Sequence, residues 1–306
     1  MHSLYAIVNH ENKMLGKGKD GFWTVLEAVR VIHNNKLIFL FIALFTTLPL
    51  SFLFFTLSIT THTLRSHIYH LEALALFTST LMEARHVWHE SRDNAVYLLR
   101  IRALFLLICL PLSLAAAVSS VHTTYNFIQG KLITVNSVVN AVKENWKRPL
   151  VTAIFVYVIL FVFSPVPRVV ASGFSSPELR FMVMVIGLGF EVYLMAVMSL
   201  GIVASVVEER TGWEAITVGS DLMRGKRLIF GWLLSGLFVL VSGFMNGRVE
   251  VLLDLDGPNS EISVWDKTVL ICSYGFIVLF SYVVTTVFYC YSRMQNDDCI
   301  SLSSSL

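Results

Sequence analysis

Residues 181–207, FMVMVIGLGFEVYLMAVMSLGIVASVV, form an apolar run that contains one charged residue, Glu191. The hydrocarbon core of a bilayer is about 30 Å thick, and an α-helix of roughly 20 apolar residues can cross it. The run meets that length. It also lacks the alternation of polar and apolar residues that is typical of a membrane β-strand. These residues therefore predict a helix that spans a membrane.

Five further runs have the same character, and none of them contains a charged residue. Backbone amides in lipid must bond within their own segment, so together the six runs predict six transmembrane helices and no open sheet. The composition agrees, because 55% of residues are hydrophobic and 14% are charged, too few to cover a soluble domain of this kind. The five runs are residues 37–58, 103–121, 150–166, 228–245 and 268–291.

The fold class predicted is therefore an all-α membrane protein. We expect a flexible N-terminal segment over residues 1–20, a single membrane domain over 21–291 and a polar C-terminal tail over 292–306. Residues 61–100 form an insert between the first two membrane helices. Its uncharged stretch is too short to span a bilayer, so we expect an interfacial or partly buried helix there.

The distribution of charge predicts the orientation. A cytoplasmic N-terminus would place 14 Lys and Arg residues on the cytoplasmic side of six spans and 9 on the other. The opposite side would then carry the acidic segment 248–267. Both termini are expected in the cytosol, with the first helix as an uncleaved anchor in the endomembrane system (endoplasmic reticulum) or the plasma membrane.

Three segments that precede membrane helices can be overlaid without a gap, namely residues 22–37, 135–150 and 213–228. The overlay places Ala28, Ala141 and Gly219 in register. In the second segment apolar and polar residues separate onto two helical faces, which indicates an amphipathic helix. We therefore predict three pseudo-repeats, 22–122, 134–207 and 211–291, each with an interfacial amphipathic helix followed by two membrane helices.

Basic residues gather at the ends of the second and third interfacial helices. At the cytoplasmic leaflet such residues lie close to lipid phosphates, and we expect them to contact anionic headgroups. The candidate residues are Lys147, Arg148, Arg224, Lys226 and Arg227.

Several of these features together resemble an uncharacterised plant family of multi-pass transmembrane proteins. The resemblance rests on Arg102-Ala103 before an apolar run, on Tyr125 and Gly130-Lys131, and on the segment from Val138 through Trp146 to Thr152. It covers most of residues 21–291 and implies a membrane fold without an assigned activity. The family is sometimes labelled as binding a polyadenylate-binding protein, and these residues give no physical basis for that label.

The insert holds the richest group of metal-ligand side chains, with imidazole and carboxylate groups three residues apart on one helical face. Membrane hydroxylases with two irons need about eight such ligands, and the remaining spans supply almost none. Solvated histidines on an amphipathic helix are therefore the favoured interpretation, with a metal site as the alternative. The candidate ligands are His67, His70, Glu83, His86 and His89.

Glu191 is the one ionisable residue in the middle of a predicted span. A carboxylate in lipid costs several kcal/mol unless it is neutral or paired, so it is a functional candidate by default. It could serve a proton or cation pathway. The alternative is a protonated side chain that bonds to a neighbouring helix.

No catalytic set or cofactor motif occurs in the chain, and the net charge of +2 is too small to predict nucleic-acid binding. The leading hypothesis is thus a non-enzymatic membrane protein that organises lipid or acts as an adaptor, without a cofactor. Its expected partner is the bilayer, through anionic headgroups, and a protein partner stays open. The alternatives are a small-solute or ion transporter that uses Glu191 and a metal-dependent membrane enzyme that uses the insert.

Overall fold

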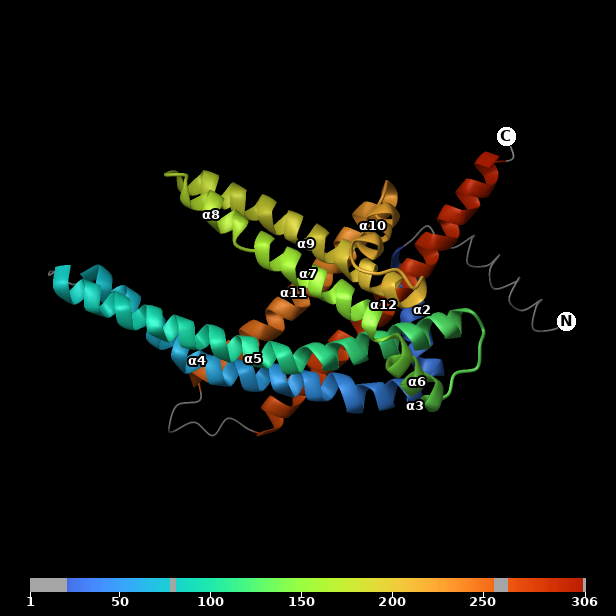
Figure 1. Ribbon diagram of the computed structural model, residues 1–306, viewed down its shortest axis with the longest axis horizontal. Helices are drawn as coiled ribbons and strands as arrows, with labels where there is room; N and C mark the ends of the chain where they lie inside the picture. The colour runs from blue at the N-terminus through green and yellow to red at the C-terminus, as the bar shows by residue number, and fades with distance from the viewer. Residues whose placement is uncertain (1–20, 78–80, 256–263, 305–306) are drawn as a thin grey trace. The chain divides into compact units, whose positions relative to one another are not determined.

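The computed structural model describes residues 21–77, 81–255 and 264–304, and every regular element in those ranges is a helix (Figure 1). The all-α prediction is confirmed, while the predicted N-terminal segment lies outside the described residues. The elements are α2 (Gly21–Asn34), α3 (Lys36–Ile42), η1 (Ala43–Thr47), α4 (Leu48–Phe77), α5 (Leu81–Ile128), α6 (Val135–Asn145), α7 (Lys147–Phe163), α8 (Val166–Ser172), α9 (Pro177–Val207), α10 (Trp213–Leu222), α11 (Lys226–Leu255) and α12 (Val264–Ser304).

Six helical stretches among the described residues are long and apolar enough to cross a membrane, and each contains one of the six predicted runs. They indicate an integral membrane protein. The second helical stretch continues past the predicted run to Ile128 and so includes a polar segment. The stretches are Lys36–Ile68, His89–Ile128, Lys147–Ser172, Pro177–Val207, Arg227–Leu252 and Trp265–Met294.

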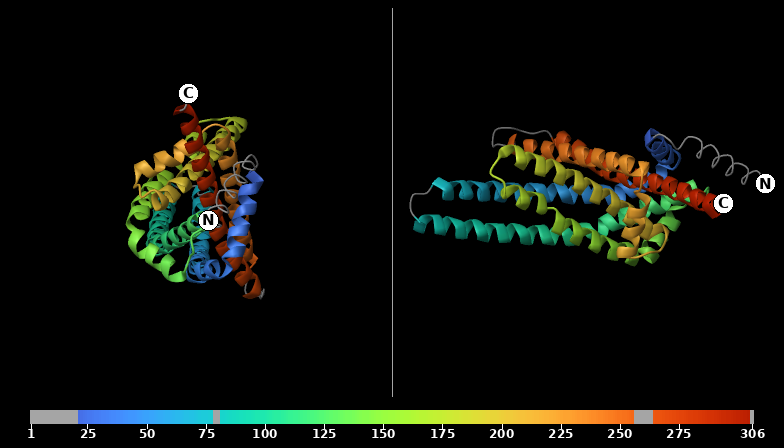
Figure 2. Two further views of the ribbon diagram at one scale, coloured as in Figure 1. Left: turned by 90° about the vertical axis from the view of Figure 1, so that its right-hand side faces the viewer. Right: turned by 90° about the horizontal axis from the view of Figure 1, so that it is seen from above.

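The described part of the insert is helical and partly buried, which is one of the two arrangements expected for it. The helix α4 continues through it to Phe77, and α5 already begins at Leu81. The two helices lie side by side there (Figures 1 and 2). Ile68 and Leu71 are buried, so the apolar stripe of the insert packs within the bundle and extends the membrane helices.

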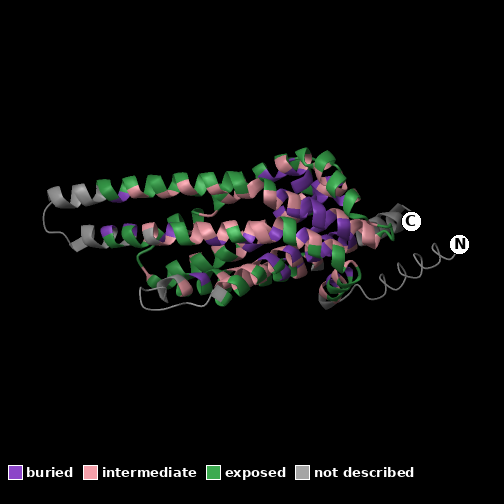
Figure 3. Cartoon of the chain, turned by 90° about the horizontal axis from the view of Figure 1, so that it is seen from below, coloured by how far each residue is buried: buried purple, intermediate pink, exposed green. Residues whose placement is uncertain are grey.

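The chain forms two compact units. Among the described residues, unit 1 comprises 21–43, 114–241 and 277–304, and unit 2 comprises 44–77, 81–113, 242–255 and 264–276. The cluster of buried apolar side chains lies within unit 1, where α9, α10 and the second half of α12 supply most of it. Figure 3 shows these buried residues gathered together in purple.

Within unit 1, α9 and α10 approach each other closely at two glycines. A Cβ atom on Gly219 would lie 2.6 Å from the carbonyl oxygen of Val197 and 3.0 Å from the amide nitrogen of Gly201. Small residues allow such close backbone approach in membrane proteins, where van der Waals packing drives helix association. These glycines therefore fix α10 against the membrane helix.

The three short helices α2, α6 and α10 occupy the segments expected to precede membrane helices. The residues placed in register by the overlay, Ala28, Ala141 and Gly219, are all buried. This burial agrees with amphipathic helices that have one packed face. The organisation of the chain into three pseudo-repeats stays a prediction.

Candidate functional site

The connector between α9 and α10 begins where the fourth apolar stretch ends, at Val207. Its sequence is Glu208-Glu209-Arg210-Thr211-Gly212. Glu209 has a φ of 59°, a left-handed conformation that is uncommon for a residue with a side chain, and Gly212 has a φ of 57°. A backbone of this kind persists where its surroundings hold it, so the contacts of the connector are informative.

Glu208 is the centre of a polar network in unit 1. Its carboxylate accepts a hydrogen bond from the Tyr289 hydroxyl and lies 3.3 Å from Nε of Arg293. Its second oxygen lies 3.4 Å from Nε of Arg210. The Glu208 side chain is only 15% exposed, so these partners replace much of its hydration. The network joins the end of α9 to the second half of α12.

Two further contacts attach the connector to α7. The Oε2 atom of Glu209 lies 2.8 Å from Nη1 of Arg148, and the Gly212 amide donates to the buried Thr152 hydroxyl at 3.0 Å. Thr152 in turn donates to the carbonyl oxygen of Arg148 at 3.2 Å. The connector is therefore held by two membrane helices, which explains how its left-handed residues are stabilised.

The predicted lipid-contact residues have different surroundings. Arg148 pairs with Glu209, Arg224 pairs with Asp221 at 2.9 Å, and Arg227 donates to the Ser292 carbonyl oxygen at 2.7 Å. The Lys226 side chain lies outside the described part of the structure. Lys147 is exposed at the start of α7, and no ion pair to it occurs within the described residues. Of the predicted basic set, three arginines thus have structural partners, and Lys147 is an exposed cation without an ion pair in the described part.

Two exposed tryptophans lie at the ends of the short helices α6 and α10. Trp146 directly precedes Lys147 and is 43% exposed, and Trp213 opens α10 and is 61% exposed. Indole rings concentrate at the boundary between lipid and water, where one edge is apolar and the N–H is solvated. An exposed indole and ammonium group at the end of an apolar helix match the chemistry of the headgroup layer.

Glu191 lies near the middle of α9 and is half-buried. Its neighbours on α9 are engaged in apolar and aromatic contacts, since the Phe190 ring lies 5.9 Å from that of Phe163 and Trp232 donates to the Gly189 carbonyl oxygen at 2.9 Å. Within the described chain, no hydrogen bond or ion pair reaches the Glu191 carboxylate. Its role in transport stays a prediction.

The histidine candidates have local partners in unit 2. His67 Nδ1 lies 3.5 Å from the Asn94 side-chain nitrogen, and His89 Nδ1 lies 3.4 Å from Asp93 Oδ2. The side chains of Glu83 and His86 lie outside the described part. Across the side chains that are described, no three metal-binding groups converge. Among the described side chains, the candidates His67, His70 and His89 therefore do not form a metal centre.

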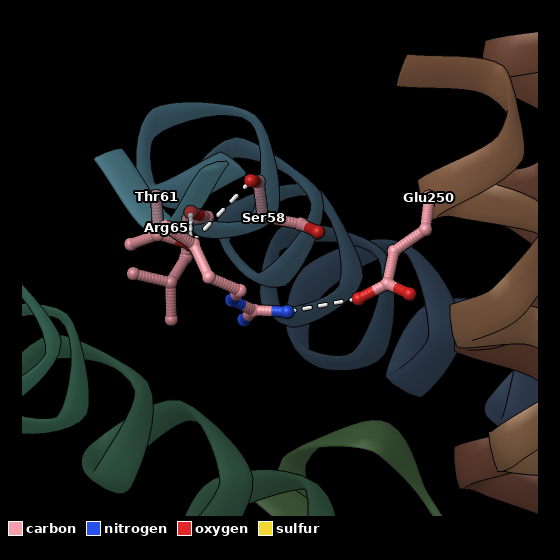
Figure 4. A network of polar contacts seen from close by, with 5 residues as sticks. Ser58, Thr61, Arg65 and Glu250 are labelled. Carbon is pink, nitrogen blue, oxygen red and sulfur yellow. Dashed lines mark hydrogen bonds and ion pairs between the residues drawn. The ribbon is translucent and has the colours of Figure 1, made fainter. Parts of the chain in front are cut away.

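One ion pair in unit 2 joins residues far apart in the sequence. Arg65 of α4 extends toward Glu250 of α11, and its Nη1 atom lies 2.8 Å from Glu250 Oε1 (Figure 4). Both side chains are well exposed, so this pair is expected to add less than about 1 kcal/mol to stability.

We expect Glu250→Gln to lower the free energy of unfolding by less than about 1 kcal/mol, with a smaller loss at high salt because screening already weakens the pair. Arg65→Gln should lose about as much, and the double variant no more than either single one. Denaturant unfolding of all four proteins measures this cycle. Additive losses in the double variant would show that the pair contributes nothing.

The sequence hypothesis missed a polar segment at the end of α5. Residues 119–126 read SSVHTTYN, and they lie inside a helix that meets the criteria for a membrane span. Four of these side chains, Ser119, Ser120, Thr123 and Thr124, are buried. The Asn126 side-chain nitrogen lies 3.0 Å from His122 Nε2. Their sequence signal is the density of small hydroxyl side chains directly after a run of alanines.

The Glu208 network was also missed, because adjacent charges after an apolar run are typical of a solvated loop. Tyr289 and Arg293 lie four residues apart and so share a face of α12. That spacing shows that both could reach one partner. It does not identify Glu208 as that partner, because the contact depends on the packing of α9 beside α12.

Comparison with known proteins gives one family. A family model described as a domain of unknown function (DUF8558) matches residues 19–305. The match supports an uncharacterised multi-pass protein and indicates neither a plant origin nor a polyadenylate-binding-protein partner. No curated protein and no solved structure matches the chain.

Proposed function

The chain belongs to the family described as a domain of unknown function (DUF8558), and we propose that this membrane protein organises lipid by binding anionic headgroups near α6 and α10. Because the family has no assigned function, the proposal is based on the site. The role requires no catalysis and no cofactor. The expected ligand is a lipid headgroup that contains a phosphate and has a net negative charge.

The observation that carries the proposal is the exposed pair Trp146 and Lys147 at the start of a membrane helix. The indole favours the boundary between lipid and water, and the ammonium group is attracted by anionic lipid with about 1 kcal/mol per basic residue. Lys143, one turn earlier on α6, is also exposed. Trp213 adds a second indole beside the connector.

A protein adaptor would use the same exposed surface. The lipid proposal is favoured because the surface directly adjoins apolar helix ends, where headgroups are the nearest anions in a bilayer. The basic residues with structural partners, Arg148 and Arg227, support the architecture around the surface. Lys143 and Lys147 are then the residues expected to respond to lipid charge.

The test measures how strongly spin-labelled lipids associate with the protein in bilayers of zwitterionic lipid. We expect the wild-type protein to prefer a phosphatidylserine probe over phosphatidylcholine. The Lys143→Gln/Lys147→Gln variant should lose most of this preference. At about 1 kcal/mol per residue, each lysine accounts for up to roughly a fivefold change in relative association.

Arg168→Gln is the matched control, because Arg168 is exposed on α8, the helix that follows α7. It removes one charge from the other end of the same membrane stretch and should keep the preference. A wild-type protein without any preference would contradict the proposal. So would a preference that survives the double variant or falls equally in the control.

A further inference from the structure

Three hydroxyl side chains in the interior of unit 1 have unusual surroundings. Ser120, Thr123 and Thr124 of α5, here called the α5 hydroxyl cluster, are each fully buried. Their hydroxyl oxygens find no hydrogen-bond partner within the described chain. A buried hydroxyl without a partner costs about 1–3 kcal/mol, so three within two turns need a physical explanation.

Other hydroxyl groups in these helices bond to their own backbone. Ser119 donates to the Ala115 carbonyl oxygen at 2.6 Å, and Thr286, which is also fully buried, donates to Tyr282 at 2.7 Å. This bond to the preceding turn is the usual arrangement for Ser and Thr in a membrane helix. The α5 hydroxyl cluster does not use it, so its hydroxyls are available to another molecule.

The three residues lie on one side of α5. Ser120 is three residues before Thr123 and four before Thr124, and residues at these spacings are neighbours with Cβ atoms about 5–6 Å apart. One small molecule that both donates and accepts hydrogen bonds can therefore reach two of the hydroxyls at once. The spacing makes this a shared site and not three separate defects.

The lack of charged residues on this part of α5 favours a neutral ligand. Residues 114–128 of α5 contain no Asp, Glu, Lys or Arg. An ion in the interior needs a charged partner, whereas a neutral molecule needs only hydrogen bonds. Water is the neutral ligand that fits three small hydroxyl groups, and buried water typically makes about three hydrogen bonds to such groups.

We propose that the α5 hydroxyl cluster binds ordered water in the interior of unit 1. The site continues a polar run that includes the contact between His122 and Asn126 and reaches the end of the helix. It places a hydrophilic point in the buried interior of unit 1, next to the end of the apolar run of α5. This is the property that a solute pathway requires, and it arises here independently of Glu191 and of lipid binding.

The experiment uses X-ray radiolysis of the full chain in nanodiscs, which produces hydroxyl radicals from water and marks the side chains beside it. Val121 of α5 is fully buried, so bulk water cannot mark it, and it lies three residues before Thr124, which makes the two residues neighbours on the helix. We expect oxidation at Val121 in the wild-type protein. The Ser120→Ala/Thr123→Val/Thr124→Val variant should lose at least half of it, whereas Thr286→Val, which removes a self-bonded hydroxyl, should not.

Thermal unfolding gives a second, independent reading. Replacing a hydrated hydroxyl with a methyl group leaves the water short of a partner, so Thr123→Val or Thr124→Val should lower the melting temperature by a few degrees, roughly 2–4 °C for each. An orphaned hydroxyl would give the opposite result, since its removal is stabilising. Unoxidised Val121 in the wild-type protein, oxidation that persists in the triple variant, or a raised melting temperature would each overturn the proposal.

Discussion

Gly219→Ala is expected to destabilise unit 1 strongly, because the added methyl group meets backbone atoms of a neighbouring helix. The new Cβ would lie 2.6 Å from the carbonyl oxygen of Val197 and 3.0 Å from the amide nitrogen of Gly201, both backbone atoms of α9. A backbone held in a membrane helix cannot move away as a side chain can. Overpacking of this kind costs about 1–3 kcal/mol and occasionally more. The melting temperature in detergent should fall by roughly 5–10 °C.

The matched control is Gly236→Ala, in α11 of the same unit. Its Cβ would lie 3.7 Å from Cγ1 of Val192, an ordinary van der Waals distance. Alanine is also the better helix former by about 1 kcal/mol, so this variant should melt no lower than the wild type. Equal melting temperatures for the two variants would show that α9 and α10 are not in close contact at Gly219.

Glu208→Gln is expected to produce the second large loss of stability. It removes the charge that Arg210 and Arg293 share but leaves an amide oxygen that the Tyr289 hydroxyl can still reach. Hydrogen bonds to charged groups contribute about 1.5–3 kcal/mol, and the partial exposure of both arginines keeps the loss within that range. Denaturant unfolding should show a decrease of about 2 kcal/mol.

Glu214→Gln serves as its control, because Glu214 is exposed on α10 and forms no ion pair among the described residues. It should change stability by less than about 0.5 kcal/mol. Tyr289→Phe tests the remaining hydrogen bond and should cost less than Glu208→Gln. If Glu208→Gln and Glu214→Gln behave alike, the network around Glu208 contributes nothing to stability.

The membrane helices could be predicted from the sequence because their signal is local. Each apolar run is long enough to identify itself, as the segment around Glu191 shows. The burial of Ser119, Ser120, Thr123 and Thr124 was not predicted, because residues 119–126 have the composition of a loop. Those side chains are buried by neighbouring helices, and hydropathy along one segment contains no information about neighbours.

The site was predictable only in part for the same reason. The exposed cations Lys147 and Arg224 follow from the amphipathic pattern of short helices before membrane spans. The partners of Arg148 and Glu208 come from different membrane helices and depend on how those helices pack. Spacing in α12 identifies a shared face for Tyr289 and Arg293, and only the fold identifies the carboxylate that both contact.

The sidedness of the short helices tests the account most directly, because anionic lipid is concentrated in the cytoplasmic leaflet. Each test protein lacks the native cysteines and carries one new cysteine, either at Asn136 in α6 or at Ser175 between α8 and α9. Both positions are exposed. We expect a membrane-impermeant maleimide to label Ser175→Cys in intact cells, or in sealed vesicles with the lumenal side outward. Asn136→Cys should react only after permeabilisation. Labelling of both positions from one side, or of Asn136→Cys alone before permeabilisation, would contradict the membrane topology and with it the proposed function.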